Sequence, residues 1–242
     1  DAARQIESIW VYLNEIDQTR LPEGMEDPAE FVLVPTARPI VFRTFMKEAG
    51  MQAIAVGFPE RLHYAFDSHD LRLALVWQGG FLDAEATWDN RFAPLTLPLG
   101  ERLIPFPSGP SLARLETEAA AWPNPSARAR FEGYRLDKAG VLAFFYEIDG
   151  VRVEESLRPA ATGRLDRGLK LTEETPSGHL LWLRMASGKE IMREDGEYVI
   201  DSTWRTSVSG DPVVRQQGDL RELLLPIHFA EGRAKVEQQI LW

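Results

Sequence analysis

The strongest constraint on this fold is a rhythm of short apolar runs that begins near residue 30 and continues to the end of the chain. Gly, Pro, Asp and Asn separate these runs, and no long helical segment lies between most of them. Strands joined by short turns pair antiparallel, because parallel neighbours need a long connection. The sequence therefore predicts a mainly β fold, namely a large antiparallel β-sandwich, built as a supersandwich or as two β units and preceded by one N-terminal amphipathic helix. We expect strand content above roughly 35% and helix content below roughly 20%.

Two stretches carry the clearest hairpin signals. Asp149-Gly150 lies between two apolar runs, which is the strongest short-range indication of a tight hairpin. Ser68-His69-Asp70 has the composition of a turn and joins two further apolar runs. These signals predict strands at Arg61–Asp67, Leu71–Gln78, Phe131–Asp137, Val141–Ile148 and Val151–Leu157. Further strands are expected at Phe31–Val34, Ile40–Phe45, Gln52–Gly57, Leu165–Glu173, His179–Ala186, Lys189–Arg193, Tyr198–Ile200, Ser202–Val208, Arg221–Ala230 and Ala234–Trp242.

Ahead of the strands, residues 2–17 have the apolar spacing of an amphipathic helix. Asp1 stands at the N-cap position, and Pro22 and Gly24 end the element. We therefore divide the chain into a helix and linker over residues 1–25 and a β-sandwich domain over residues 26–242. The helix either packs on this chain's own strands or, as we expect, contacts another chain or a further domain. Its contact side chains recur every three or four residues and are Ile6, Ile9, Trp10, Leu13 and Ile16.

The segment 93–128 interrupts the hairpin rhythm with proline. It holds seven of the chain's 16 prolines. Because proline cannot donate to a strand ladder, we expect an ordered crossing or a linker here, with one helical turn near Ser111–Ala120. This segment either divides the sandwich domain into two β units or wraps around a single one.

Charge and cysteine content exclude several classes of protein. Lys and Arg total 27 against 37 Asp and Glu, so the formal charge of −10 disfavours nucleic acid and anionic membrane surfaces as partners. No apolar run approaches the ~20 residues of a membrane-spanning helix. Without cysteine the chain has no disulfide, no zinc–thiolate site and no CxxCH attachment site for haem. We assign no catalytic, cofactor-binding or metal-binding residue from these patterns.

One short segment has the composition of a sugar-binding surface. Trp88 is followed by Asp89 and, two residues later, by Arg91, and an aromatic face beside such polar groups suits a carbohydrate. His63 is a further candidate ligand contact. The alternative, which the pattern favours, is that Trp88 anchors a loop on the core while Arg91 pairs with a nearby aspartate.

Histidine and acidic residues give weaker signals. His63 and His69 flank a predicted turn and could hold a metal only with an added carboxylate such as Asp67 or Asp70; the favoured alternative is histidines satisfied by hydrogen bonds. Glu154-Glu155 is a pair of adjacent acids within a predicted strand. Because neighbouring strand residues point to opposite faces, the two carboxylates cannot converge on one substrate. The chain also lacks a GxSxG nucleophile motif and a phosphate-binding glycine motif.

Several collinear stretches resemble a known class of protein. Ile9-Trp10-Val11-Tyr12-Leu13 resembles the end of the C-terminal helix of a class I c-type cytochrome. The chain beyond this segment resembles the region after the cytochrome module in multidomain periplasmic c-type cytochromes of planctomycetes and related bacteria. The matching stretches cover most of residues 1–160 and are Arg38–Phe45, Ala53–Pro59, His63–Asp67, Leu73–Trp77, Gly80–Asp83 and Phe131–Asp137.

The resemblance implies a non-catalytic role in the periplasm. The chain would be a β-sandwich region of, or partner to, a c-type cytochrome electron-transfer protein, where it would serve docking or assembly. Haem c would be carried only by an adjoining domain or a partner, since this chain has no CxxCH and no axial-methionine loop. A carbohydrate-binding or mutarotase-like β-sandwich is the alternative from the residues themselves.

Overall fold

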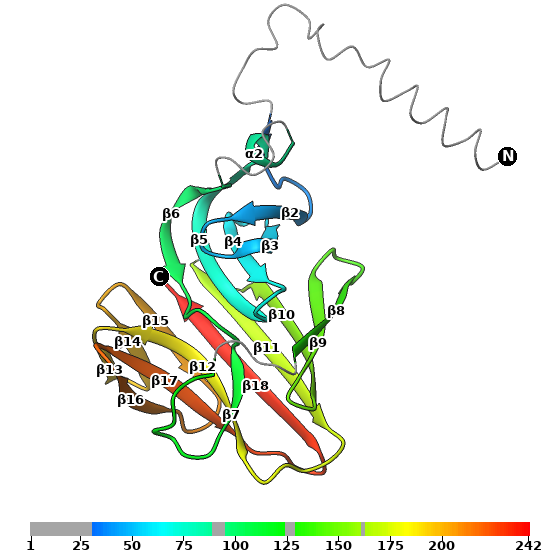
Figure 1. The fold of residues 1–242 in the computed structure, drawn as a ribbon. Coiled ribbons are helices and arrows are strands. Elements are labelled where there is room, and N and C mark those ends of the chain that lie inside the picture. Colours follow the sequence, from blue (N-terminus) through cyan, green and yellow to red (C-terminus); the bar gives the residue numbers. More distant parts are fainter. Residues whose placement is uncertain (1–30, 89–94, 124–128, 161–162) are drawn as a thin grey trace, which may run out of the picture. The chain divides into compact units, whose positions relative to one another are not determined.

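The computed structural model describes residues 31–88, 95–123, 129–160 and 163–242, and its fold is mainly β (Figure 1). Strands make up 64% of these residues and helix 2%, which confirms the predicted antiparallel β class. The one described α-helix is the short α2, Glu85–Trp88. The helix expected over residues 2–17, with its apolar stripe, lies outside the described residues. No helix of the described ranges is long and apolar enough to cross a membrane.

A six-stranded antiparallel sheet is formed by the first part of the described chain. The strand order is β1-β5-β4-β3-β2, and β6 also pairs with β5. The hairpin of β4 and β5 confirms the predicted turn at residues 68–70. The strands are β1 (Val32–Leu33), β2 (Ile40–Met46), β3 (Gly50–Gly57), β4 (Leu62–Asp67), β5 (Arg72–Asp83) and β6 (Pro98–Pro105).

An eight-stranded antiparallel sheet is formed mainly by the second half of the chain, in the order β13-β14-β15-β18-β11-β10-β9-β8. It contains the predicted meander, with Asp149 at positive φ in the turn between β9 and β10, as a tight hairpin requires. Its strands are β8 (Ala129–Leu136), β9 (Leu142–Ile148), β10 (Val151–Pro159), β11 (Arg164–Glu173), β13 (Ile191–Glu194), β14 (Glu197–Ile200), β15 (Trp204–Val208) and β18 (Arg233–Leu241).

A four-stranded antiparallel sheet completes the fold, in the order β16-β17-β12-β7. Its strands are β7 (Leu112–Leu115), β12 (Leu180–Gly188), β16 (Val213–Gln217) and β17 (Leu220–Ile227). β7 comes from the proline-rich segment, and β16 lies in a stretch where the sequence predicted no strand.

One apolar core joins the three sheets. It combines side chains of β3, β4, β9, β10, β11, β12 and β17, which places the six-stranded and four-stranded sheets against the same face of the eight-stranded sheet. We call this its inner face. At the first contact, Phe66 of β4 stacks on Phe144 of β9 with ring centroids 4.2 Å apart. The arrangement is sandwich-like, with the long sheet as one layer and the two shorter sheets as the other (Figure 1).

The six-stranded sheet curls on itself. Thr96, just before β6, forms a parallel bridge with Met46 of β2 and donates its N–H to the Phe45 carbonyl at 2.8 Å, so the two edges of the sheet meet. The enclosed face carries a second apolar cluster that includes Trp77 and Phe81 beside several alanines. Small side chains fit here because the strongly curved sheet leaves little room inside.

The prediction of a helical turn near Ser111–Ala120 is wrong. Residues 112–115 instead form edge strand β7, which pairs with β12. The chain around β7 then covers the outer face of the four-stranded sheet: Trp122 donates its indole N–H to the Pro110 carbonyl at 2.8 Å and stacks under the Arg184 guanidinium. Local proline content could not predict this, because the strand depends on a partner far away in the sequence.

Three buried charges hold this cover in place. Arg184 and Arg215 both bind the carboxylate of Glu222, and both also donate to backbone carbonyls of the covering segment. From Leu33 to Trp242 the chain forms one compact unit, and residues 1–32 are assigned to another. The described residues of the proline-rich segment, 95–123, therefore lie within the larger unit.

Candidate functional site

His63, predicted as a ligand contact, is a buried packing residue. Its exposed fraction is 1%, and its ring packs against both Trp77 and Phe81, which stack on each other. The Phe58 N–H donates to Nδ1 at 3.2 Å, which leaves the proton on Nε2 to be donated to the Gly79 carbonyl at 3.0 Å. Burial lowers the pKa of His63 to about 4, although the Gly79 hydrogen bond opposes this shift. Both ring nitrogens are thus satisfied by backbone groups.

Of the other predicted sugar contacts, the structure describes only Trp88. Trp88 ends α2, is 57% exposed and packs edge-on against Phe42 of β2 with ring centroids 5.5 Å apart. Asp89 and Arg91 lie outside the described residues. Within the described ranges there is also no group of three His, Cys, Asp or Glu side chains placed to hold a metal ion.

Glu154 and Glu155 of β10 point to opposite faces of the eight-stranded sheet, as their spacing requires. Glu155 faces the inner core and is fully buried, while the Glu154 side chain is 37% exposed on the outer face. Arg167 Nε of β11 donates to Glu155 Oε1 at 2.7 Å, and the Tyr146 hydroxyl of β9 donates to Oε2 at 2.6 Å. The buried carboxylate is therefore paired and hydrogen-bonded, which is what a charge in a protein interior needs.

This inner network extends across the core. Arg167 also donates to Gln238 of β18 at 3.2 Å and to the hydroxyl of Ser111 at 3.4 Å. Burial and the neighbouring Glu155 charge raise the pKa values of Tyr64 and Tyr146 well above the usual value, so both phenols are neutral. Because Glu155 and Arg167 are engaged by other core side chains, the network has a structural role.

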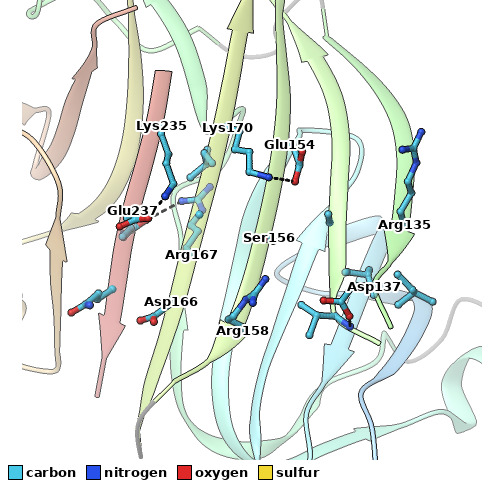
Figure 2. Close-up of a pocket in the computed structure, with 18 residues that line it drawn as sticks. Arg135, Asp137, Glu154, Ser156, Arg158, Asp166, Arg167, Lys170, Lys235 and Glu237 are labelled. Carbon is cyan, nitrogen blue, oxygen red and sulfur yellow. Dashed lines mark hydrogen bonds and ion pairs between the residues drawn. The ribbon is translucent and has the colours of Figure 1, made fainter. Parts of the chain in front are cut away.

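The outer face of the same sheet carries a groove of about 670 Å³. Its floor is a row of small residues on neighbouring strands, Ala143 of β9, Ser156 of β10 and Gly168 of β11, which the strand register places side by side. Figure 2 shows the charged side chains that surround this floor, which come from the end of β8 and from β10, β11 and β18. They are Arg135, Asp137, Glu154, Arg158, Asp166, Lys170, Lys235 and Glu237.

Ion pairs organise the walls of this outer groove. Lys170 Nζ lies 2.7 Å from Glu154 Oε1, and Lys235 pairs with Glu237. Asp166 accepts a hydrogen bond from Arg164 at 3.3 Å. These contacts fix polar groups on a rigid sheet, and they leave donors and acceptors facing an open channel. Such an arrangement is suited to binding a polar ligand.

Sequence reasoning did not find the outer groove. Its residues alternate with buried ones along four strands and are individually typical of a solvated strand face. A signal was present in the small outward residues at positions 143, 156 and 168, but their alignment depends on strand register, which the sequence did not supply.

A family model described as a domain of unknown function (DUF6797) matches residues 64–155, which is less than half of the chain. The matched stretch runs from β4 into β10 and so includes Arg135, Ala143 and Glu154 of the groove. No curated protein matches the chain.

Proposed function

We propose that this chain is a non-catalytic binding module and that the outer groove of the eight-stranded sheet holds a carbohydrate chain. The observation that carries the proposal is the row of small residues between organised ion pairs. Ala143, Ser156 and Gly168 leave room for a sugar ring, while paired carboxylates and cations on both sides offer acceptors and donors to vicinal hydroxyls.

The outer groove suits a sugar better than a protein partner. The core of a protein interface is depleted of charge and enriched in aromatic residues, whereas this groove is lined largely by charged groups. Beside the groove, on the same face of the sheet, the side chain of Phe145 is partly exposed and lies under the Arg135 guanidinium, which is 5.0 Å from the ring centroid. Phe145 is opposite Glu154 in the strand register and could offer a ring edge to the ligand.

A glycan panel tests the proposal. The full chain should bind at least one neutral or acidic oligosaccharide of three or more units, measured by isothermal titration calorimetry. Hydrogen exchange in the presence of that oligosaccharide should slow at β9, β10 and β11 and stay unchanged at β16. Binding of no oligosaccharide, or protection confined to α2, would contradict the proposal.

A docking role beside a c-type cytochrome is the second candidate. Its support is the sequence resemblance together with exposed leucines on and beside β6, since apolar side chains in water mark contact surfaces. Leu97, Leu99 and Leu103 are 58%, 46% and 44% exposed. In this proposal the chain is periplasmic, and haem c belongs to an adjoining domain or a partner.

Absorption spectroscopy tests this second candidate. The natively expressed protein should co-purify with a partner that has a haem Soret band, and changing both Leu99 and Leu103 to Gln should remove that partner. Met192→Gln, at a 38% exposed position on β13, is the matched control. Absence of haem from the native complex would contradict the cytochrome association.

A further inference from the structure

The charged groups of the outer groove are not equally engaged. Its four carboxylates all have partners within the chain: Glu154 with Lys170, Glu237 with Lys235, Asp166 with Arg164, and Asp137 with backbone N–H groups. The Asp137 carboxylate accepts from the N–H groups of residues 139 and 141, both at 2.9 Å. The carboxylates therefore have reduced capacity to receive a cationic ligand.

Two arginines of the groove, unlike most of these carboxylates, have no oppositely charged partner among the described residues. Arg158 of β10 is exposed and makes no ion pair or hydrogen bond through its side chain within the described ranges. Arg135 of β8 is also exposed, and its contact there is the face of Phe145 rather than an acid. A guanidinium is a planar donor that binds a carboxylate through two parallel hydrogen bonds. The free binding capacity of the groove is therefore for anions.

The strand register separates these two arginines. Arg135 is two strands away from Ser156, and Arg158 is two residues further along β10. With strands about 4.8 Å apart and a rise of about 3.3 Å per residue, their Cα atoms lie roughly 12 Å apart. Two separate acidic groups on one extended ligand would reach them more easily than a single carboxylate.

We propose that the groove selects acidic carbohydrate chains, with a uronate carboxylate bound by Arg158 and a second one by Arg135. This inference rests on the proposed carbohydrate-binding function and names its ligand class. Polyphosphates are disfavoured, since they offer no hydroxyl groups to the paired carboxylates that line the groove. A chain of sugar hydroxyls with spaced carboxylates matches both the ion-paired walls and the two arginines.

Matched ligands test the inference. The full chain is titrated calorimetrically with tetramers of galacturonate, glucuronate and mannuronate, and with their methyl esters, which keep the sugar and remove the charge. At least one acid tetramer should bind ten or more times as tightly as its ester, and 0.5 M salt should weaken that preference. The corresponding monosaccharide should bind far more weakly than the tetramer.

A matched pair of variants locates the effect. Arg158→Gln should lower affinity for the acid tetramer at least tenfold and leave affinity for the ester unchanged. Arg152→Gln removes an exposed arginine of the same strand whose side chain pairs with Glu174, and it should change neither affinity. Because Arg158 is exposed, its substitution should not impair folding, which circular dichroism would check.

The outcomes separate this inference from the proposed function. Equal binding of acid and ester, or binding only of neutral glycans, overturns the acidic selectivity and keeps the carbohydrate site. An acid preference that survives Arg158→Gln overturns the assignment of Arg158. Failure of every oligosaccharide, neutral or acidic, overturns both proposals.

Discussion

Two neighbouring glutamates on β10 experience opposite environments. Glu155 faces the core, where its carboxylate is paired with Arg167 and hydrogen-bonded by Tyr146. Glu154, one residue earlier, faces solvent and pairs with the exposed Lys170. The period of two in a strand separates them, and burial then gives the same side chain a different energetic role. On the inner face the charged groups pair with one another inside the core. On the outer face they remain accessible to a ligand.

The shorter sheets extend this contrast between covered and open faces. The outer face of the four-stranded sheet is covered by the chain around β7, with buried Arg184, Arg215 and Glu222 sealing the contact. The outer face of the eight-stranded sheet carries an open groove with a floor of small residues. We expect ligand binding on a sheet face that is polar, that is not covered by other parts of the chain, and whose charged side chains are held in place by ion pairs.

Substitution of the two glutamates should give the largest difference in the free energy of unfolding. Glu155→Gln leaves the buried Arg167 guanidinium without its counter-ion and should lower the free energy of unfolding by about 3–5 kcal/mol. Glu154→Gln removes an exposed pair and should cost less than about 0.5 kcal/mol. Urea unfolding monitored by tryptophan fluorescence measures both values. Equal losses in the two variants would contradict the division of the sheet into a sealed and an open face.

The enclosed face of the six-stranded sheet should respond to pH through His63. Its folded pKa is about 4, below the ordinary 6.5, so between these values the unfolded chain binds a proton that the folded chain does not. The free energy of unfolding should therefore be highest above pH 6.5 and fall as pH decreases toward 4, by up to about 3 kcal/mol from this group.

Two histidine variants isolate this contribution. His63→Gln should reduce the loss of stability between pH 6.5 and pH 4, whereas His69→Gln, in an exposed turn, should keep the full loss. Unfolding free energies at several pH values give the two slopes. Identical slopes would mean that His63 is not held neutral by burial.

The smallest expected difference in the free energy of unfolding is between substitutions of two buried tyrosines on the inner face. Tyr146 donates its hydroxyl to Glu155, so Tyr146→Phe should cost about 2 kcal/mol. The Tyr64 hydroxyl is buried and has no hydrogen-bond partner among the described residues, so Tyr64→Phe should be neutral or stabilise by up to about 1 kcal/mol. Thermal unfolding by calorimetry would rank the two, and a greater loss for Tyr64→Phe would reverse the expected order.

Local sequence signals predicted most of the strands because hairpins are local. The meander around Asp149-Gly150 and the opposite orientation of Glu154 and Glu155 both follow from short-range rules. β7 was missed because its pairing with β12 spans about 65 residues of sequence, and β6 because prolines mark both of its ends. Local chemistry could not reveal that the proline-rich chain covers a sheet.

The candidate site was less predictable than the fold. Trp88 and His63 attracted attention because aromatic and histidine side chains often bind ligands, yet His63 is satisfied by backbone groups. The outer groove depends on the register of four strands. Consecutive hairpins join β9, β10 and β11, but β18 comes from far along the sequence to pair with β11. Arg158 differs from its charged neighbours only in that they pair among themselves, which is a property of the folded sheet and not of the sequence.

Filling the floor of the outer groove tests the central claim most directly. A Cβ added at Gly168 would meet only the Ser156 hydroxyl, at 3.9 Å, so Gly168→Phe should project a ring into the groove without disturbing the strand. Gly178, where an added Cβ meets nothing within 4 Å, provides the matched control Gly178→Phe outside the groove. Both variants are titrated with the oligosaccharide that binds the unaltered chain most tightly. We predict that Gly168→Phe abolishes binding at an unchanged unfolding midpoint while Gly178→Phe binds normally; undiminished binding by Gly168→Phe would contradict the assignment of the groove.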